Sequence, residues 1–83
     1  MTTEIIPFPA TRRVGFIRNV ARVLASYSAD AAETALSARL GTQHDALLRK
    51  GITPDVAARE VRSLELAIRA RLWVIVMQGG DAA

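Results

Sequence analysis

The chain has no cysteine and a single histidine among its 83 residues. Without cysteine there are no disulfide bonds and no thiolate metal sites, and one histidine cannot build a histidine-rich metal cage. A chain of this length buries only about 60–65% of the surface that it exposes when unfolded. Small domains without disulfides or metals often gain stability by oligomerisation. We therefore expect a second copy or a protein partner, and a cytoplasmic location suits a cysteine-free chain.

Motifs that carry catalysis are missing as well. The pair Gly79-Gly80 follows a helical pattern instead of opening a helix, so it is not a phosphate-binding loop. There is no HExxH motif and no nucleophile with a base at helical spacing. The helical neighbours of His44 are leucines and a glycine, so we interpret His44 as a partly buried structural residue. We predict a protein that is not an enzyme, with no catalytic residue, cofactor, metal or small-molecule substrate.

Long hydrophobic runs are also lacking. The longest is the six-residue run Leu72–Met77, far below the roughly 20 residues that span a membrane. The first residues are acidic, and Pro7 and Pro9 interrupt the apolar residues that follow, which does not resemble a secretory signal. We expect a soluble protein with no membrane partner.

The basic residues are unevenly spread along the chain. The net charge is +3, from eleven basic and eight acidic residues, and ten of the eleven bases are arginine. Residues 11–28 contain no acid, and they hold Arg12, Arg13, Arg18 and Arg22. Most charge clusters on small helices keep a protein soluble. The alternative interpretation is a surface for an acidic partner, such as nucleic acid.

Residues 1–10 are predicted to form an extended arm before a single helical domain of residues 11–83. Large apolar groups alternate with prolines in Ile5–Pro9, and proline fixes φ and lacks an N–H. Ile6 and Phe8 either cap the open end of the helical domain or dock in a groove of a partner.

Apolar residues at a helical period predict three helices in the domain. The first runs from Thr11 or Arg12 to Tyr27. The second begins with Asp30 as its N-cap, and Glu33 three residues later completes a capping-box arrangement.

The second helix is predicted to end at Gly51, in the left-handed conformation that glycine favours. We interpret Gly41, in the middle of this alanine-rich helix, as a point of close approach to a neighbouring helix. The third helix starts with Thr53 as its cap and Pro54 at its first position. The two glycines after Gln78 predict its end.

The predicted fold is an all-α three-helix bundle, with the second and third helices as an antiparallel hairpin and the first packed across them. The second and third helices, about 20 and 25 residues long, exceed what a DNA-binding helix-turn-helix requires. The core line of the third helix is Ala57, Val61, Leu64, Ile68, Leu72 and Ile75.

A second face of the third helix carries Arg62, Leu66, Arg69 and Trp73, and it is our candidate partner-binding surface. Arginine and tryptophan beside apolar residues are typical of interface hot spots, and Trp73 lies within cation–π reach of Arg69. Charge reversal at Arg62 and Arg69 is expected to spare folding. Alternatively, Trp73 packs under the arm. Because Leu72–Met77 is apolar on every side and must be covered, we predict a homodimer.

The arm sequence IIPFP, followed by Arg12 and Arg13, and the stretch RSLELAIRARLW from Arg62 to Trp73 resemble a group of small helical proteins. These proteins occur in alphaproteobacterial genomes and their phages, and their functions are uncharacterised. The two stretches cover about a quarter of the chain, and neither is a catalytic signature. The resemblance implies a phage or prophage accessory protein, a class that includes stoichiometric inhibitors of host defence such as anti-CRISPR proteins.

These observations predict a non-enzymatic interaction protein, an inhibitor or adaptor that occupies a surface of a host or phage protein complex. The alternative is a small regulator that binds nucleic acid through the arginines of the first helix. Salt dependence separates the two, because phosphate binding weakens steeply as salt rises.

Overall fold

The structure is a computed structural model that describes residues 13–82, with side chains described as far as Gln78. The predicted arm of residues 1–10 lies outside this range. Three helices and no strand make up the described part: α1 (Val14–Ala25), α2 (Ala29–Arg49) and α3 (Pro54–Ala82). The prediction of an all-α three-helix bundle is confirmed.

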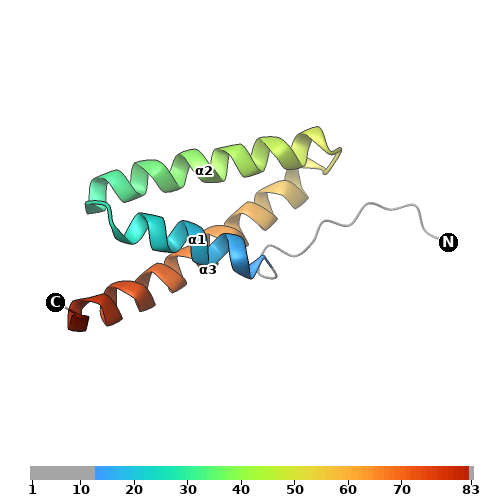
Figure 1. Cartoon of the computed structure of the whole chain (residues 1–83). Helices are drawn as coiled ribbons and strands as arrows, with labels where there is room; N and C mark the ends of the chain where they lie inside the picture. The colour runs from blue at the N-terminus through green and yellow to red at the C-terminus, as the bar shows by residue number, and fades with distance from the viewer. Residues whose placement is uncertain (1–12, 83) are drawn as a thin grey trace.

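The long helix α3 connects the bundle. Both α1 and α2 pack against α3, and they contact one another much less. Figure 1 shows α2 and α3 as an antiparallel hairpin that opens away from its turn, with α1 lying against α3 at the open side. The core draws on all three helices: Ile17, Val20, Leu24, Ala32, Leu36, Leu64 and Ile68. The predicted core line of α3 is confirmed at its centre, where Leu64 and Ile68 are buried.

Helix α1 is shorter than predicted at both ends. It begins at Val14, not at Thr11 or Arg12, because Arg13 has a ψ of 59°, outside the helical range. The Arg13 guanidinium donates a 2.6 Å hydrogen bond to Gln43 Oε1 on α2 and lies 4.5 Å from the centre of the Phe16 ring. These contacts anchor the chain entering α1 to α2. At the other end α1 stops at Ala25, so Tyr27 lies in the connection to α2.

Helix α2 is capped by Ser28, and the prediction that Asp30 is the N-cap was wrong. Ser28 has extended backbone angles, and its Oγ accepts a 3.2 Å hydrogen bond from the Ala31 N–H. Asp30 lies inside the first turn, where its charge interacts favourably with the positive end of the helix. Glu33 does not complete a capping box either, because its carboxylate is bound by α3.

The turn after α2 has the predicted left-handed glycine. Gly51 has a φ of +89°. Its N–H donates to the Leu48 carbonyl at 3.0 Å, and the Ile52 N–H donates to the Leu47 carbonyl at 3.1 Å. This double hydrogen bond is a Schellman motif, and the buried Ile52 supplies the apolar contact that accompanies it.

The prediction that Gly41 marks a close helix approach was wrong. A Cβ atom placed on Gly41 would meet nothing within 4 Å, and the residue is exposed. Gly41 is nine residues after the buried Ala32, which places it on the opposite side of α2.

Helix α3 starts as predicted and ends later. Thr53 Oγ1 accepts a long, 3.5 Å hydrogen bond from the Val56 N–H, in front of Pro54. The helical backbone then continues through Gly79 and Gly80 to Ala82, so the predicted end after Gln78 was wrong. Glycine weakens a helix by about 1 kcal/mol relative to alanine, but it ends one only where it takes the left-handed conformation, as Gly51 does. Within residues 13–82, no helix combines the length and apolar character that crossing a membrane requires.

Candidate functional site

The predicted partner-binding face of α3 is open to solvent at all four of its residues. Trp73 is 66% exposed and Leu66 is 55% exposed, and Arg62 is exposed beside them. Trp73 therefore has little cover from the described part of the chain. Whether this face binds a partner stays a prediction.

Arg69, the fourth residue of that face, instead binds carboxylates of the chain itself. Its two terminal nitrogens donate to the two carboxylate oxygens of Glu33 on α2, at 2.7 and 2.9 Å. Its Nε donates to Glu65, one turn earlier on α3, at 3.0 Å. The expected cation–π contact with Trp73 is thus replaced by ion pairs. Arg69 is a bridge between α2 and α3, and whether it also contacts a partner stays a prediction.

The same ion pairs shift the acidity of the groups involved. The hydrogen bond from Arg69, helped by its charge, lowers the pKa of Glu33 below its ordinary value. The hydrogen bonds from Glu33 and Glu65 raise the pKa of Arg69 further above its already high value. Because Arg69 is held between two carboxylates, its charge is locally neutralised on this face.

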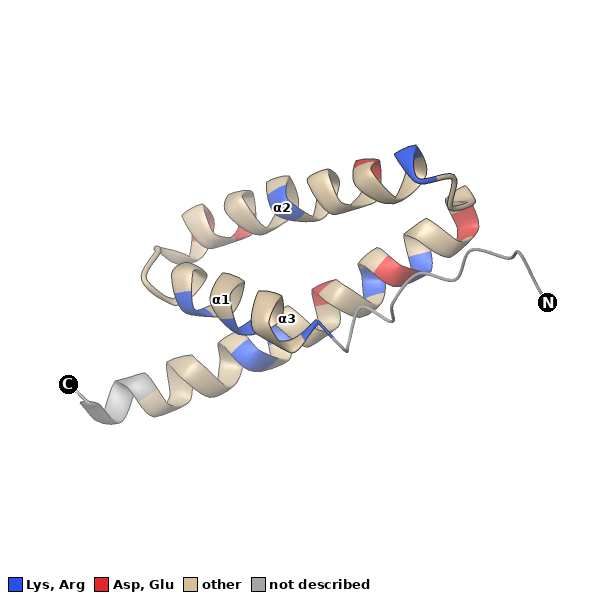
Figure 2. Cartoon of the chain, turned by 45° about the vertical axis from the view of Figure 1, so that its right-hand side comes forward, with Lys and Arg blue, Asp and Glu red and all other residues tan. Residues whose placement is uncertain are grey.

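An apolar, uncharged surface remains at the far end of α3. Met77 is 57% exposed and Val76 is 52% exposed, next to Trp73 and the partly exposed Val74. We call these four residues the apolar end of α3. Residues 72–78 contain no charged residue. Figure 1 shows this part of α3 extending past α1, and Figure 2 shows the same stretch free of basic and acidic residues.

The predicted basic face of the first helix is divided by the structure. Arg12 lies outside the described residues, and Arg13 turns toward Gln43 and Phe16. Arg18 and Arg22 face a cleft between α1 and α3, which we call the basic cleft. It has a volume of about 480 Å³ and is lined by Gly15, Arg18, Asn19, Arg22, Arg71 and Ile75.

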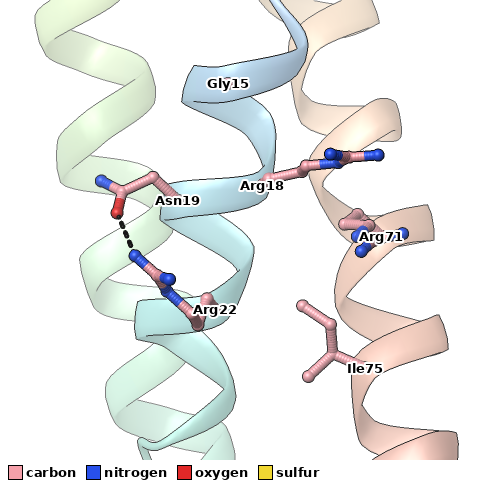
Figure 3. Close-up of a pocket in the computed structure, with 6 residues that line it drawn as sticks. All are labelled: Gly15, Arg18, Asn19, Arg22, Arg71 and Ile75. Atoms are coloured by element: carbon pink, nitrogen blue, oxygen red, sulfur yellow. Dashed lines mark hydrogen bonds between the residues drawn. The ribbon is translucent and has the colours of Figure 1, made fainter.

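Three arginines from two helices line the basic cleft, and none of its described lining residues is acidic. Figure 3 shows Arg18 reaching from α1 toward α3, where Arg71 lies, while Arg22 turns back along α1. Arg22 donates a 3.1 Å hydrogen bond to Asn19 Oδ1, a neutral acceptor. The Nε atom of Arg71 is buried and has no hydrogen-bond acceptor among the described residues. A buried donor without an acceptor costs about 1–3 kcal/mol. The three arginines, with no acid among the described lining residues, suit the cleft to an anion.

Arg71 was missed in the sequence, although a signal for it exists. It lies three residues after Ile68 and four before Ile75, so it shares the side of α3 that holds the core line. An arginine within an apolar line faces either the core or a neighbouring helix. The sequence does not show that this neighbour is the arginine-bearing side of α1.

His44 is half-buried on α2, as predicted. Within the described residues, no group of histidine, aspartate and glutamate side chains is arranged to hold a metal ion. The two features of the described surface that stand out are the exposed apolar end of α3 and the arginine-lined basic cleft.

The fold and these two surfaces define a small all-α protein, a three-helix bundle whose last helix projects beyond the others. The chain belongs to DUF6074, a family of unknown function whose model matches residues 1–83. The resemblance to small helical proteins of uncharacterised function is confirmed to this extent. No curated protein matches the chain, and no solved structure does.

Proposed function

We propose that the protein is a non-enzymatic interaction module that binds through the apolar end of α3. The observation that carries this proposal is the 66% exposure of Trp73 beside the similarly exposed Met77 and Val76. Tryptophan is strongly enriched among the residues that dominate interface energies, and contiguous exposed apolar side chains mark interaction surfaces. Leu66, two turns before Trp73 on the same face, extends the surface toward the middle of the helix.

The first partner of this surface is a second copy of the chain. Residues 72–78 are uncharged, so two copies related by a two-fold axis can pack these turns together without burying like charges. The nearest charge on the predicted binding face, that of Arg69, is already compensated by Glu33 and Glu65. A homodimer would cover the turns of α3 that extend past α1.

We further propose that the module acts as a stoichiometric inhibitor or adaptor of a host or phage protein complex, in the manner of anti-CRISPR proteins. The resemblance of the IIPFP and RSLELAIRARLW stretches to proteins of alphaproteobacteria and their phages supports this role. In this role the protein would act by occupying a surface, and Arg62 and Leu66 would contact the larger complex.

Light scattering after size-exclusion chromatography tests the dimer. The wild type should elute as a dimer at micromolar concentration, and Trp73→Glu should elute as a monomer with unchanged helical circular dichroism. The matched control is Val14→Glu, which places the same charge at an apolar, 49% exposed position of α1 and should stay dimeric. A monomeric wild type, or equal loss of the dimer in both variants, would contradict the proposal.

Affinity capture from host lysate tests the inhibitor or adaptor role. Immobilised wild-type protein should retain a defined complex, identified by mass spectrometry, and Leu66→Glu should lose it while remaining dimeric and folded. Retention of the same complex by Leu66→Glu would place the docking surface elsewhere and contradict this part of the proposal.

A further inference from the structure

The basic cleft is the second described surface that lacks a partner within the chain. It brings Arg18 and Arg22 from α1 together with Arg71 from α3, and its other lining residues are neutral. It is formed by α1 and the opposite side of α3 from Trp73, since Arg71 and Trp73 are two residues apart on one helix. A small anion bound in the cleft would therefore leave Trp73 free.

We propose that the basic cleft binds phosphate groups, with Arg18, Arg22 and Arg71 donating hydrogen bonds to the phosphate oxygens. The planar fork of a guanidinium matches phosphate geometry and forms charge-assisted bonds with it. Arg71 Nε has no acceptor among the described residues. Arg22 is held only by the neutral Asn19 at 3.1 Å, a weaker partner than an anion, so it can turn into the cleft when one binds.

The arrangement favours phosphate over the carboxylate of an acidic peptide. Each arginine offers five N–H donors, whereas one carboxylate has two oxygens. Three arginines together therefore offer more donors than a single carboxylate can accept, and a phosphate offers more oxygens and more charge. A cleft of about 480 Å³ also leaves space beside the phosphate for the molecule that carries it.

Recognition should be confined to the phosphate and its charge. Among the described residues, no aromatic ring lines the cleft and Ile75 is its one large apolar residue. This part of the chain therefore gives a nucleic-acid base no ring on which to stack. The phosphate can come from a free ion, such as pyrophosphate, or from the backbone of a nucleic-acid strand. In the second case, binding should be independent of base sequence.

Fluorescence anisotropy with a short labelled DNA strand, together with calorimetric titration of pyrophosphate, tests this proposal at low salt. Arg18→Gln and Arg71→Gln should each weaken binding roughly tenfold, and Arg71→Lys should retain part of it. The logarithm of affinity should fall with the logarithm of salt concentration with a slope of about −2 for three contacts on a single strand, and Arg71→Gln should reduce its magnitude by about 0.7.

Arg39→Gln is the matched control, because it removes one exposed arginine from α2 and changes the net charge equally. It should bind within roughly twofold of the wild type, and so should Trp73→Glu, which separates this proposal from the dimer. Binding of both probes would show that free phosphate suffices, and binding of the strand alone would identify a nucleic-acid backbone as the source; either result supports the site. The proposal would be overturned if Arg39→Gln and Arg71→Gln lost equal amounts of binding affinity. It would also be overturned if polyglutamate bound equally tightly, or if neither probe bound.

Discussion

Arg69 and Trp73 are one turn apart on α3 and have different environments. The Arg69 guanidinium is held at 2.7 to 3.0 Å by Glu33 and Glu65, while the Trp73 ring is largely exposed. The difference comes from α2, which places Glu33 opposite Arg69 and nothing comparable opposite Trp73. Of these two residues on one predicted face, Arg69 therefore joins two helices, and Trp73 remains available for contact with a partner.

The two arginines of that face should respond differently to charge reversal. Arg62→Glu changes an exposed residue that no ion pair of the described residues involves, and its melting temperature should shift by at most about 4 °C. Arg69→Glu brings a third carboxylate between Glu33 and Glu65 and should lower the melting temperature clearly more. The expectation that both reversals spare folding assumed that Arg69 has contacts only within its own helix, and the ion pair with Glu33 on α2 contradicts that assumption. Thermal denaturation followed by circular dichroism compares the two, and equal melting temperatures would contradict the bridging role.

Glu33 should make stability depend on pH in the acid range. Because Arg69 lowers the pKa of folded Glu33 below 4.5, the pair contributes stability that is fully present above that value. The contribution is lost as the pH falls through the lowered pKa, where folded Glu33 takes up a proton. The melting temperature of the wild type should therefore be higher than that of Glu33→Gln at neutral pH. The two melting temperatures should become equal as the pH falls into the acid range.

The convergence should depend on Arg69 and on salt. In an Arg69→Gln background, Glu33→Gln should have little effect at any pH, which a double-mutant cycle measures. High salt should reduce the difference at neutral pH, because the pair is exposed. If the difference in melting temperature between the wild type and Glu33→Gln persisted unchanged in acid, it would contradict this explanation.

At the scale of the element, some helix ends are set by contacts within one turn and others by contacts with residues far away in the sequence. Gly51 ends α2 through hydrogen bonds within its own turn, and its position is readable from the sequence. The start of α1 is set by Arg13, which bonds to Gln43, thirty residues away. Ser28 and Asp30 are both good capping residues, and the path of the chain from α1 into α2 decided between them.

The cap of α2 can be checked directly. Ser28→Ala should lower the free energy of unfolding by about 1 kcal/mol, because the Ala31 N–H loses its acceptor. Ser28→Asp should keep the cap, since aspartate caps as well as serine does. Chemical denaturation measures both variants. If Ser28→Ala left the free energy of unfolding unchanged and Asp30→Ala lowered it strongly, Asp30 would be the cap after all.

At the scale of the whole molecule, the described chain extends over 54 × 24 × 15 Å, and the core lies where all three helices meet. The turns of α3 beyond that region carry Trp73, Val76 and Met77 in exposed positions. An isolated helix end stabilised by so little packing gains most from a second copy that covers it. The proposed dimer would therefore bear on folding as well as on function.

Stability should accordingly depend on protein concentration. For a dimer, the melting temperature rises with concentration by mass action, and Trp73→Glu should abolish that dependence. Trp73 is the only tryptophan, so its emission should move to longer wavelengths when the wild type is diluted and the ring becomes hydrated. An emission maximum that is the same at all concentrations would contradict burial of Trp73 in a dimer.

The sequence by itself determined the three helices, the centre of the core line of α3, and the left-handed glycine after α2. Each of these depends on apolar period or on residues within one turn, so local physics suffices. Only the tertiary structure decided that Arg69 binds Glu33, thirty-six residues away, that Gly41 faces away from its neighbours, and that Arg71 joins Arg18 and Arg22 in one cleft. These three features depend on how the helices rotate and cross when their apolar faces pack. The periodicity of a single helix carries no information about the polar side chains that this packing brings together.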